Sequence, residues 1–112
     1  MLFRSLYAAA DVFVHPAQSE PYGMVLVEAA IVGLPLIATR QTGAVGPTAI
    51  ARPGVNALVY DAGDVAALAA HLARLRDNPA LRDAMAQESL MLSLIHEGGS
   101  SVAAVLAAAG FA

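Results

Sequence analysis

A helix-like run followed at once by a buried strand constrains the fold of this chain more than any other feature. Residues 22–32 are almost entirely apolar, Gly33 can end a helix in the left-handed conformation, and Pro35 prevents the helix from continuing. Residues 36–39 (Leu-Ile-Ala-Thr) then have the length and apolar character of a strand that is buried on both faces. Such strands are typical of parallel sheets, in which helices connect one strand to the next.

Two further short apolar segments extend the same pattern. Residues 12–14 (Val-Phe-Val) precede the helix and are bounded by Pro16, and residues 57–60 (Ala-Leu-Val-Tyr) follow the loop-rich stretch 40–54. A helix between two apolar strands with short loops is a βαβ unit, so we expect parallel pairing and a right-handed crossover. The predicted fold class is therefore α/β, with a partial Rossmann-like parallel sheet and flanking helices.

Helical patterns are expected in three further segments. Residues 2–10 carry apolar side chains at helical spacing. Asp64 can cap a helix over residues 65–77, and Pro79 suits the first position of a helix that follows. The segment 98–112 is rich in alanine and carries no functional motif.

The composition fits one small folded domain. The chain has 112 residues, of which 58% are hydrophobic, and this is too apolar for a disordered segment. We expect residues 1–97 to form a partial α/β domain and residues 98–112 to be a tail without an assigned structure. The formal net charge is -3 and lysine is absent, so the chain lacks the basic face that binds nucleic acid or an anionic membrane by charge.

The sequence also excludes several kinds of site and location. Cysteine is absent, which rules out disulfides and thiolate metal sites and agrees with a reducing cytoplasm. The histidines lack the spacing of metal ligands, so no metal and no cofactor are predicted. No apolar stretch reaches the roughly 20 residues of a membrane-spanning helix, and the N-terminus lacks the pattern of a signal peptide. We therefore expect a soluble cytoplasmic protein.

Two glutamates stand out around the start of the predicted helix. Glu28 lies among apolar residues, where a carboxylate must reach solvent, find a hydrogen-bonding partner, or be buried at a large cost in free energy. Glu20 lies in the turn that opens the helix, where unsatisfied backbone N–H groups and the helix dipole create an anion site. Two carboxylates around an anion site suit a ligand that carries both phosphate and hydroxyl groups.

The order of these motifs resembles a known family. Residues 19–33 hold the two glutamates eight positions apart, with Tyr-Gly after the first; Tyr-Ala-Ala-Ala-Asp-Val-Phe-Val-His-Pro precedes them and Gly-Leu-Pro-Leu-Ile-Ala-Thr follows. In this order, residues 6–86 resemble the retaining nucleotide-sugar glycosyltransferases of the GT-B fold, of the family 4 type. The resemblance implies the late part of a C-terminal donor-binding domain.

The resemblance also implies roles for individual residues. Glu20 is expected at the catalytic centre, where it binds hydroxyl groups of the donor sugar, and Glu28 is expected to bind the ribose. The backbone amides of Tyr22, Gly23 and Met24 are expected near the sugar and the diphosphate. Gly23 suits this place because a backbone without Cβ lets a ligand approach closely. The carboxylates would act as hydrogen-bond acceptors and not as an acid/base pair.

Three more residues are pocket candidates. His15 follows the first predicted strand, and Thr39 and Gly43 belong to the end of the second strand and the loop behind it. Open α/β sheets bind ligands at these carboxyl ends. The family often has two adjacent glycines and a later acidic residue in this loop, whereas residues 42–48 read Thr-Gly-Ala-Val-Gly-Pro-Thr.

The resemblance further implies that other polypeptide is needed for activity. A GT-B enzyme needs an N-terminal domain, so we expect this chain to depend on such a domain or on a partner chain and to be inactive alone. The expected small-molecule partners are a nucleotide-diphosphate sugar donor and an acceptor of unknown type. Exposed sheet edges favour self-association. The alternative is a non-catalytic or degenerate nucleotide-binding or interaction module.

Overall fold

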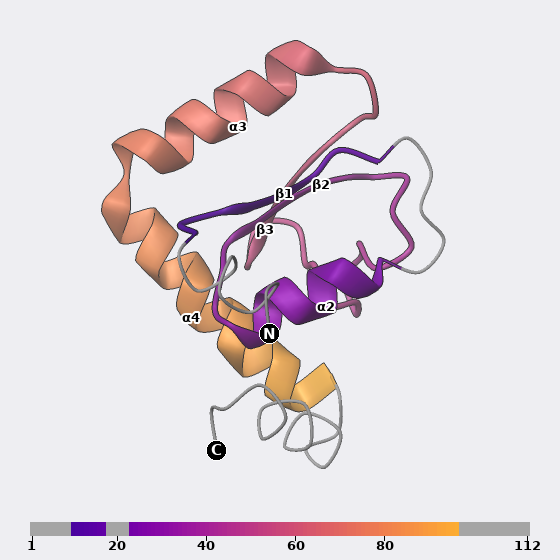
Figure 1. Cartoon of the computed structure of the whole chain (residues 1–112), viewed down its shortest axis with the longest axis vertical. Coiled ribbons are helices and arrows are strands. Elements are labelled where there is room, and N and C mark those ends of the chain that lie inside the picture. The colour runs from indigo at the N-terminus through magenta and orange to yellow at the C-terminus, as the bar shows by residue number, and fades with distance from the viewer. Residues whose placement is uncertain (1–9, 18–22, 97–112) are drawn as a thin grey trace.

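The computed structural model describes residues 10–17 and 23–96 of the chain, and these ranges contain three strands and three helices (Figure 1). In chain order they are β1 (Phe13–His15), α2 (Met24–Ile31), β2 (Leu36–Thr39), β3 (Ala57–Tyr60), α3 (Val65–Asp77) and α4 (Pro79–His96). The expected helix at residues 2–10 lies almost entirely outside the described residues, and so does the tail 98–112. Glu20 and Tyr22 also lie outside them.

The three strands form one parallel sheet in the order β1-β2-β3. In the middle of the sheet, Val14 pairs with Ile37 and Ile37 pairs with Leu58. The predicted βαβ unit is therefore confirmed, since β1 and β2 are parallel and α2 connects them. The first strand is shifted by one residue from the prediction, because the Phe13 amide donates to the Pro35 carbonyl at 3.0 Å and His15 still pairs with Ala38.

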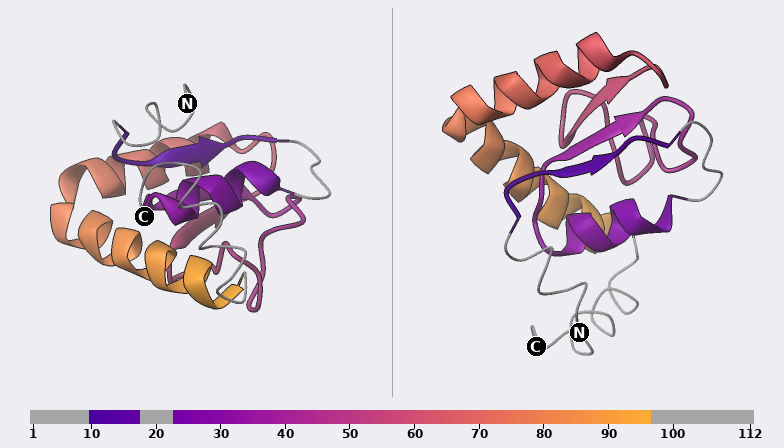
Figure 2. Two further views of the ribbon diagram at one scale, coloured as in Figure 1. Left: turned by 60° about the horizontal axis from the view of Figure 1, so that its bottom comes forward. Right: turned by 45° about the horizontal axis from the view of Figure 1, so that its top comes forward.

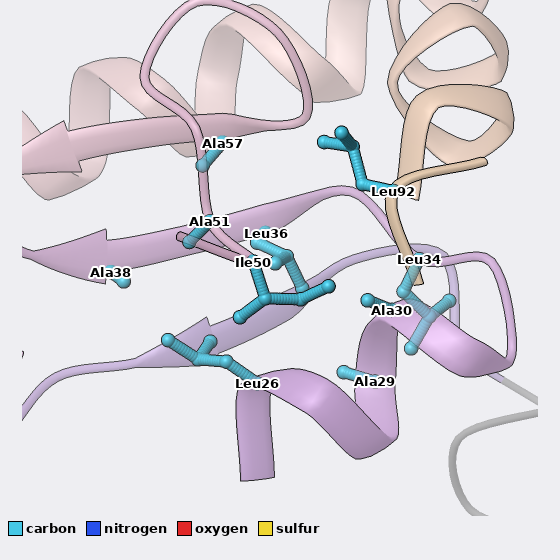
Figure 3. Packing of buried hydrophobic residues seen from close by; sticks show 10 residues of the cluster. All are labelled: Leu26, Ala29, Ala30, Leu34, Leu36, Ala38, Ile50, Ala51, Ala57 and Leu92. Atoms are coloured by element: carbon cyan, nitrogen blue, oxygen red, sulfur yellow. The ribbon is translucent and has the colours of Figure 1, made fainter. Parts of the chain in front are cut away.

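The sheet has helices on both faces, with α3 on one side and α2 on the other (Figures 1 and 2). Side chains of a strand alternate between the two faces. Leu36 and Ala38 accordingly belong to the core on the α2 face, whereas Ile37 belongs to the core with Leu75 of α3. Figure 3 shows the first core, in which Leu92 of α4 joins residues of α2 and β2.

Glycines define both ends of α2. At its start, Gly23 has a φ of 63° and is the N-cap, so the helix begins two residues later than predicted. At its end, Gly33 has a φ of 80°, its amide donates to the Ala30 carbonyl at 2.9 Å, and the Leu34 amide donates to the Ala29 carbonyl at 3.2 Å. These two bonds are those of a Schellman motif, and they confirm Gly33 as the helix stop.

The two later helices begin where the sequence predicts. The Asp64 carboxylate accepts from the Ala67 amide at 3.0 Å, and Pro79 is the first residue of α4. Asn78 caps α4, because its Oδ1 accepts from the Leu81 amide at 3.0 Å. Within the described ranges, no helix is long and apolar enough to cross a membrane.

A buried polar network, which the sequence analysis did not predict, ties the loop before β3 to α4. The Asn56 side chain is fully buried; its Nδ2 donates to the Ile50 carbonyl and to Ser89 Oγ, and its Oδ1 accepts from the Arg52 amide. Ser89 Oγ in turn donates to the Leu34 carbonyl at 2.6 Å. Two of the three Asn56 partners, Ile50 and Arg52, lie in its own loop, and the third, Ser89, lies on α4. The network therefore shapes the loop and ties it to α4, beside the apolar contacts of Leu92 in the same core.

Candidate functional site

The carboxyl ends of the strands, occupied by His15, Thr39 and Tyr60, form one edge of the sheet, which we call the carboxyl edge. His15 pairs with Ala38, and Thr39 pairs with Tyr60, so these ends lie next to one another. The structure therefore brings two of the predicted pocket residues, His15 and Thr39, to the same edge. In open α/β sheets this edge is where ligands bind.

The start of α2 reaches the same edge and packs against the loop that follows β2. A Cβ on Gly23 would lie 2.7 Å from Ala44 Cβ and 2.9 Å from Thr42 Cγ2. The direction in which Gly23 lacks a side chain is therefore filled by this loop and not by open space. Glycine is required here because the loop after β2 packs closely against the backbone of Gly23. A contact between the Gly23 backbone and a ligand stays a prediction.

Glu28 and Met24 share the outer face of α2, four residues apart along the helix. Met24 is 64% exposed and Glu28 is exposed as well, whereas Leu26, Ala29 and Ala30 are fully buried. The carboxylate thus escapes burial among its apolar neighbours. Its contact with a ribose stays a prediction, as do the roles expected of Glu20 and Tyr22.

Thr39 is fully buried, and its hydroxyl group bonds within the protein. Its Oγ1 donates to the Ala17 carbonyl at 2.6 Å and lies 3.1 Å from Thr42 Oγ1. Gly43, next along the chain, is exposed in the turn. Of these two pocket candidates, only Gly43 is open to solvent. The buried Thr39 hydroxyl instead links Ala17, which follows β1, to Thr42, which follows β2.

His15 carries an unsatisfied polar atom. Its Nε2 is buried and has no hydrogen-bond partner within the described part of the chain, while its ring stacks on that of Phe13 at 6.4 Å between centroids. A buried nitrogen without a partner costs about 1–3 kcal/mol. Such groups usually obtain their partner from a water, an ion or a ligand, so this nitrogen is a candidate ligand contact.

Replacing His15 with phenylalanine is therefore expected to stabilise the unliganded chain. The aromatic ring can keep its stacking on Phe13, and the cost of the unsatisfied nitrogen disappears. A gain of about 1 kcal/mol corresponds to roughly 4–8 °C in the midpoint of thermal unfolding for a domain of this size. A lower midpoint, measured by calorimetry, would show that the nitrogen has a partner in solution.

Arg40 is a residue at this edge that the sequence analysis did not single out. Its amide donates to the Tyr60 carbonyl at 2.9 Å, and its Nε lies 2.9 Å from Asp61 Oδ1. Both side chains of this ion pair are more than half exposed, so the pair adds little stability but orients a cation beside the strand ends. The sequence could have indicated Arg40, because it directly follows Thr39 at the carboxyl end of a predicted strand.

A pocket of about 200 Å³ lies at the carboxyl edge on the α3 face of the sheet. Burial raises the pKa of the Tyr60 phenol above its ordinary value, so this side chain is neutral at physiological pH. The pocket is lined by Pro16, Tyr60, Gly63, Asp64, Val65 and Leu68. No group of three or more His, Asp or Glu side chains suited to a metal ion occurs within residues 10–17 and 23–96.

The family of the chain follows from comparison with known proteins. Residues 3–90 match the model of the family described as Glycosyl transferases group 1. The chain therefore belongs to the group 1 glycosyltransferases, and its α/β fold is that of the GT-B enzymes.

Three relatives illustrate this membership. The lipopolysaccharide core biosynthesis glycosyltransferase LpsD of Rhizobium meliloti is 43% identical over 76 residues, which cover 68% of this chain and 21% of LpsD. The D-inositol 3-phosphate glycosyltransferase of Thermomonospora curvata is 40% identical over 85 residues, covering 76% of this chain and 19% of that protein. The probable sucrose-phosphate synthase 5 of Oryza sativa is 38% identical over 74 residues, which cover 66% of this chain and 7% of that protein.

A solved structure shares the fold. Anabaena HepE, crystallised in complex with UDP, superposes with a TM-score of 0.73 at 23% sequence identity. The superposition covers 92% of this chain and 29% of HepE. This chain thus spans about a fifth or less of the length of the relatives named above, and less than a third of HepE.

Proposed function

We propose that this chain is the donor-binding segment of a glycosyltransferase that transfers a sugar from a nucleotide-diphosphate donor with retention of configuration. The observation that carries the proposal is the family match over residues 3–90, which includes both glutamates. The parallel sheet supports it, because it places the start of α2 beside the strand ends where α/β folds bind nucleotides.

In this proposal each glutamate accepts hydrogen bonds from hydroxyl groups of the donor. Glu20 takes the sugar and Glu28 takes the ribose, while the positive end of the α2 dipole favours the diphosphate. His15 Nε2 and the exposed Gly43 turn are further candidate contacts. The UDP held by HepE, which has the same fold, supports a nucleoside diphosphate as the common part of the ligand.

The proposal includes a second half of the enzyme. Since the matched residues make up only 21% of LpsD and 19% of the D-inositol 3-phosphate glycosyltransferase, we propose that additional polypeptide, in the same protein or in a partner chain, supplies the acceptor site and that this chain alone does not transfer sugar. We also propose a cytoplasmic location, in agreement with the absence of cysteine.

The first test is titration calorimetry of the chain with UDP, GDP and ADP, and with free glucose as the comparison. We expect one nucleoside diphosphate to bind and the free sugar not to bind, because the anion site and the ribose contact belong to the nucleotide. Absence of binding by all three nucleotides would contradict the proposal.

The second test uses a longer protein that contains this chain and transfers sugar. Glu20→Ala is expected to reduce the rate of transfer by about tenfold or more, the effect of losing a hydrogen bond to a charged group. Glu88→Ala, which removes an exposed carboxylate from α4, is the matched control. If nucleotide binds tightly but the complete protein transfers no sugar, the chain is instead a non-catalytic nucleotide-binding module.

A further inference from the structure

We propose that Thr39 and Thr42 are positioning residues for the donor site, acting through a directed chain of hydrogen bonds that we call the hydroxyl chain, Thr42–Thr39–Ala17. The inference rests on the proposed function. It assigns to these two residues an indirect role, in which neither side chain contacts the ligand. It starts from three observations at the carboxyl edge: the two short hydroxyl contacts of Thr39 and the packing of Thr42 against Gly23.

The direction of the hydroxyl chain follows from proton counting. A threonine hydroxyl has one hydrogen to donate. Thr39 uses it on the Ala17 carbonyl at 2.6 Å, because a carbonyl oxygen can only accept. In the contact of 3.1 Å between the two hydroxyl oxygens, Thr42 must therefore be the donor and Thr39 the acceptor. Donation by Thr42 polarises the Thr39 hydroxyl and strengthens its bond to Ala17.

The other side of Thr42 fixes the start of α2. Its methyl carbon Cγ2 lies 2.9 Å from the position that a Cβ on Gly23 would occupy, and Ala44 lies against the same point. Thr42 therefore contacts two parts of the proposed site, with its hydroxyl toward Thr39 and its methyl toward the N-cap of α2. The Thr42 side chain is 2% exposed, so water does not compete for either contact.

The hydroxyl chain and the methyl group of Thr42 together connect the three segments that carry the proposed ligand contacts. Ala17 stands three positions before Glu20, Thr42 stands next to Gly43, and Gly23 opens the helix that carries Glu28. A site that is held in its binding geometry before the ligand arrives pays less ordering entropy on binding. The two threonines therefore act on nucleotide affinity through the position of these segments.

The matched control is Ser89 at the opposite end of the sheet. Its hydroxyl is fully buried and also donates to a backbone carbonyl, that of Leu34, at 2.6 Å. Ser89→Ala therefore deletes a bond next to the start of β2, and Thr39→Val deletes a chemically similar bond at the carboxyl edge. Thr39→Ser keeps the hydroxyl group and serves as the conservative rescue.

The first readout needs no ligand. Amide hydrogen exchange is compared between the variants at Thr42 and Val45, whose amides donate within the loop after β2, and at Gly33 and Leu34, whose amides donate at the end of α2. We expect Thr39→Val to accelerate exchange at the first pair only and Ser89→Ala at the second pair only. If both variants accelerated exchange equally at the two pairs of amides, the hydroxyl chain would not order the loop after β2 locally, and the proposal would be overturned.

The second readout is the dissociation constant for UDP, or for GDP or ADP if wild type prefers one of these. Thr39→Val is expected to raise it about threefold to tenfold, Thr39→Ser to restore it, and Ser89→Ala to leave it unchanged. An unchanged constant in Thr39→Val would overturn the positioning role. If wild type binds none of the three nucleotides, the proposed function fails, while the exchange experiment still decides whether the hydroxyl chain orders the loop.

Discussion

Gly23→Ala is expected to destabilise the chain by roughly 2–5 kcal/mol, because it combines two costs at one position. The residue has a φ of 63° and a ψ of 35°, a left-handed conformation that costs an alanine about 1–2 kcal/mol. The added Cβ would also lie 2.7 Å from Ala44 Cβ and 2.9 Å from Thr42 Cγ2, closer than carbon atoms approach without displacement. Overpacking of this kind adds about 1–3 kcal/mol.

Gly54→Ala separates the two costs. Gly54 has a φ of 81°, and a Cβ built there has no atom within 4 Å, so only the backbone cost applies. We expect the midpoint of thermal unfolding to fall clearly further for Gly23→Ala than for Gly54→Ala. Adding Ala44→Gly to the first variant removes the closest contact and should recover part of the loss. Equal losses in the two alanine variants would mean that the loop does not pack on α2 in solution.

The sequence predicted the elements whose signals are local. β2, β3 and α3 have the predicted bounds, since each is set by turn or capping residues beside it in the chain; Asp64 and Pro79 are examples. The start of α2 was predicted two residues early, because nothing in the neighbouring residues shows that Gly23 adopts a left-handed conformation. That conformation matches its packing against a loop about 20 positions away.

The candidate site was predictable as a place but not as a set of contacts. Parallel strands put His15 and Thr39 at one edge by topology, and this outcome follows from the βαβ pattern alone. The partner of the Thr39 hydroxyl is 22 residues away, and the partner of Ser89 is 55 residues away. Such bonds depend on how whole elements dock. The pattern of residues therefore predicted a ligand role for Thr39 and did not indicate its link to Ala17.

Glu28→Gln is expected to weaken nucleotide binding ten- to a hundredfold while stability changes little or rises. The amide keeps the shape of the carboxylate and can still accept a hydrogen bond, but it loses the assistance of the charge. Hydrogen bonds to charged groups contribute about 1.5–3 kcal/mol, and each 1.4 kcal/mol is about tenfold in affinity. Stability should hold because the side chain lies on the exposed face of α2, outside the buried core.

Calorimetric titration of the Glu28→Gln and Glu88→Gln variants with the same nucleotide tests this expectation. Glu88 is an exposed helical glutamate on α4, so its replacement makes the same change in net charge away from the carboxyl edge. If a ribose binds Glu28, only Glu28→Gln loses affinity for the nucleotide. A general effect of charge would instead raise the affinity of both variants, because each substitution removes one negative charge that repels the anionic nucleotide. Unchanged affinity in Glu28→Gln, or a complex in which this carboxylate points away from the loop after β2, would assign Glu28 to the surface and leave Glu20 as the remaining carboxylate of the site.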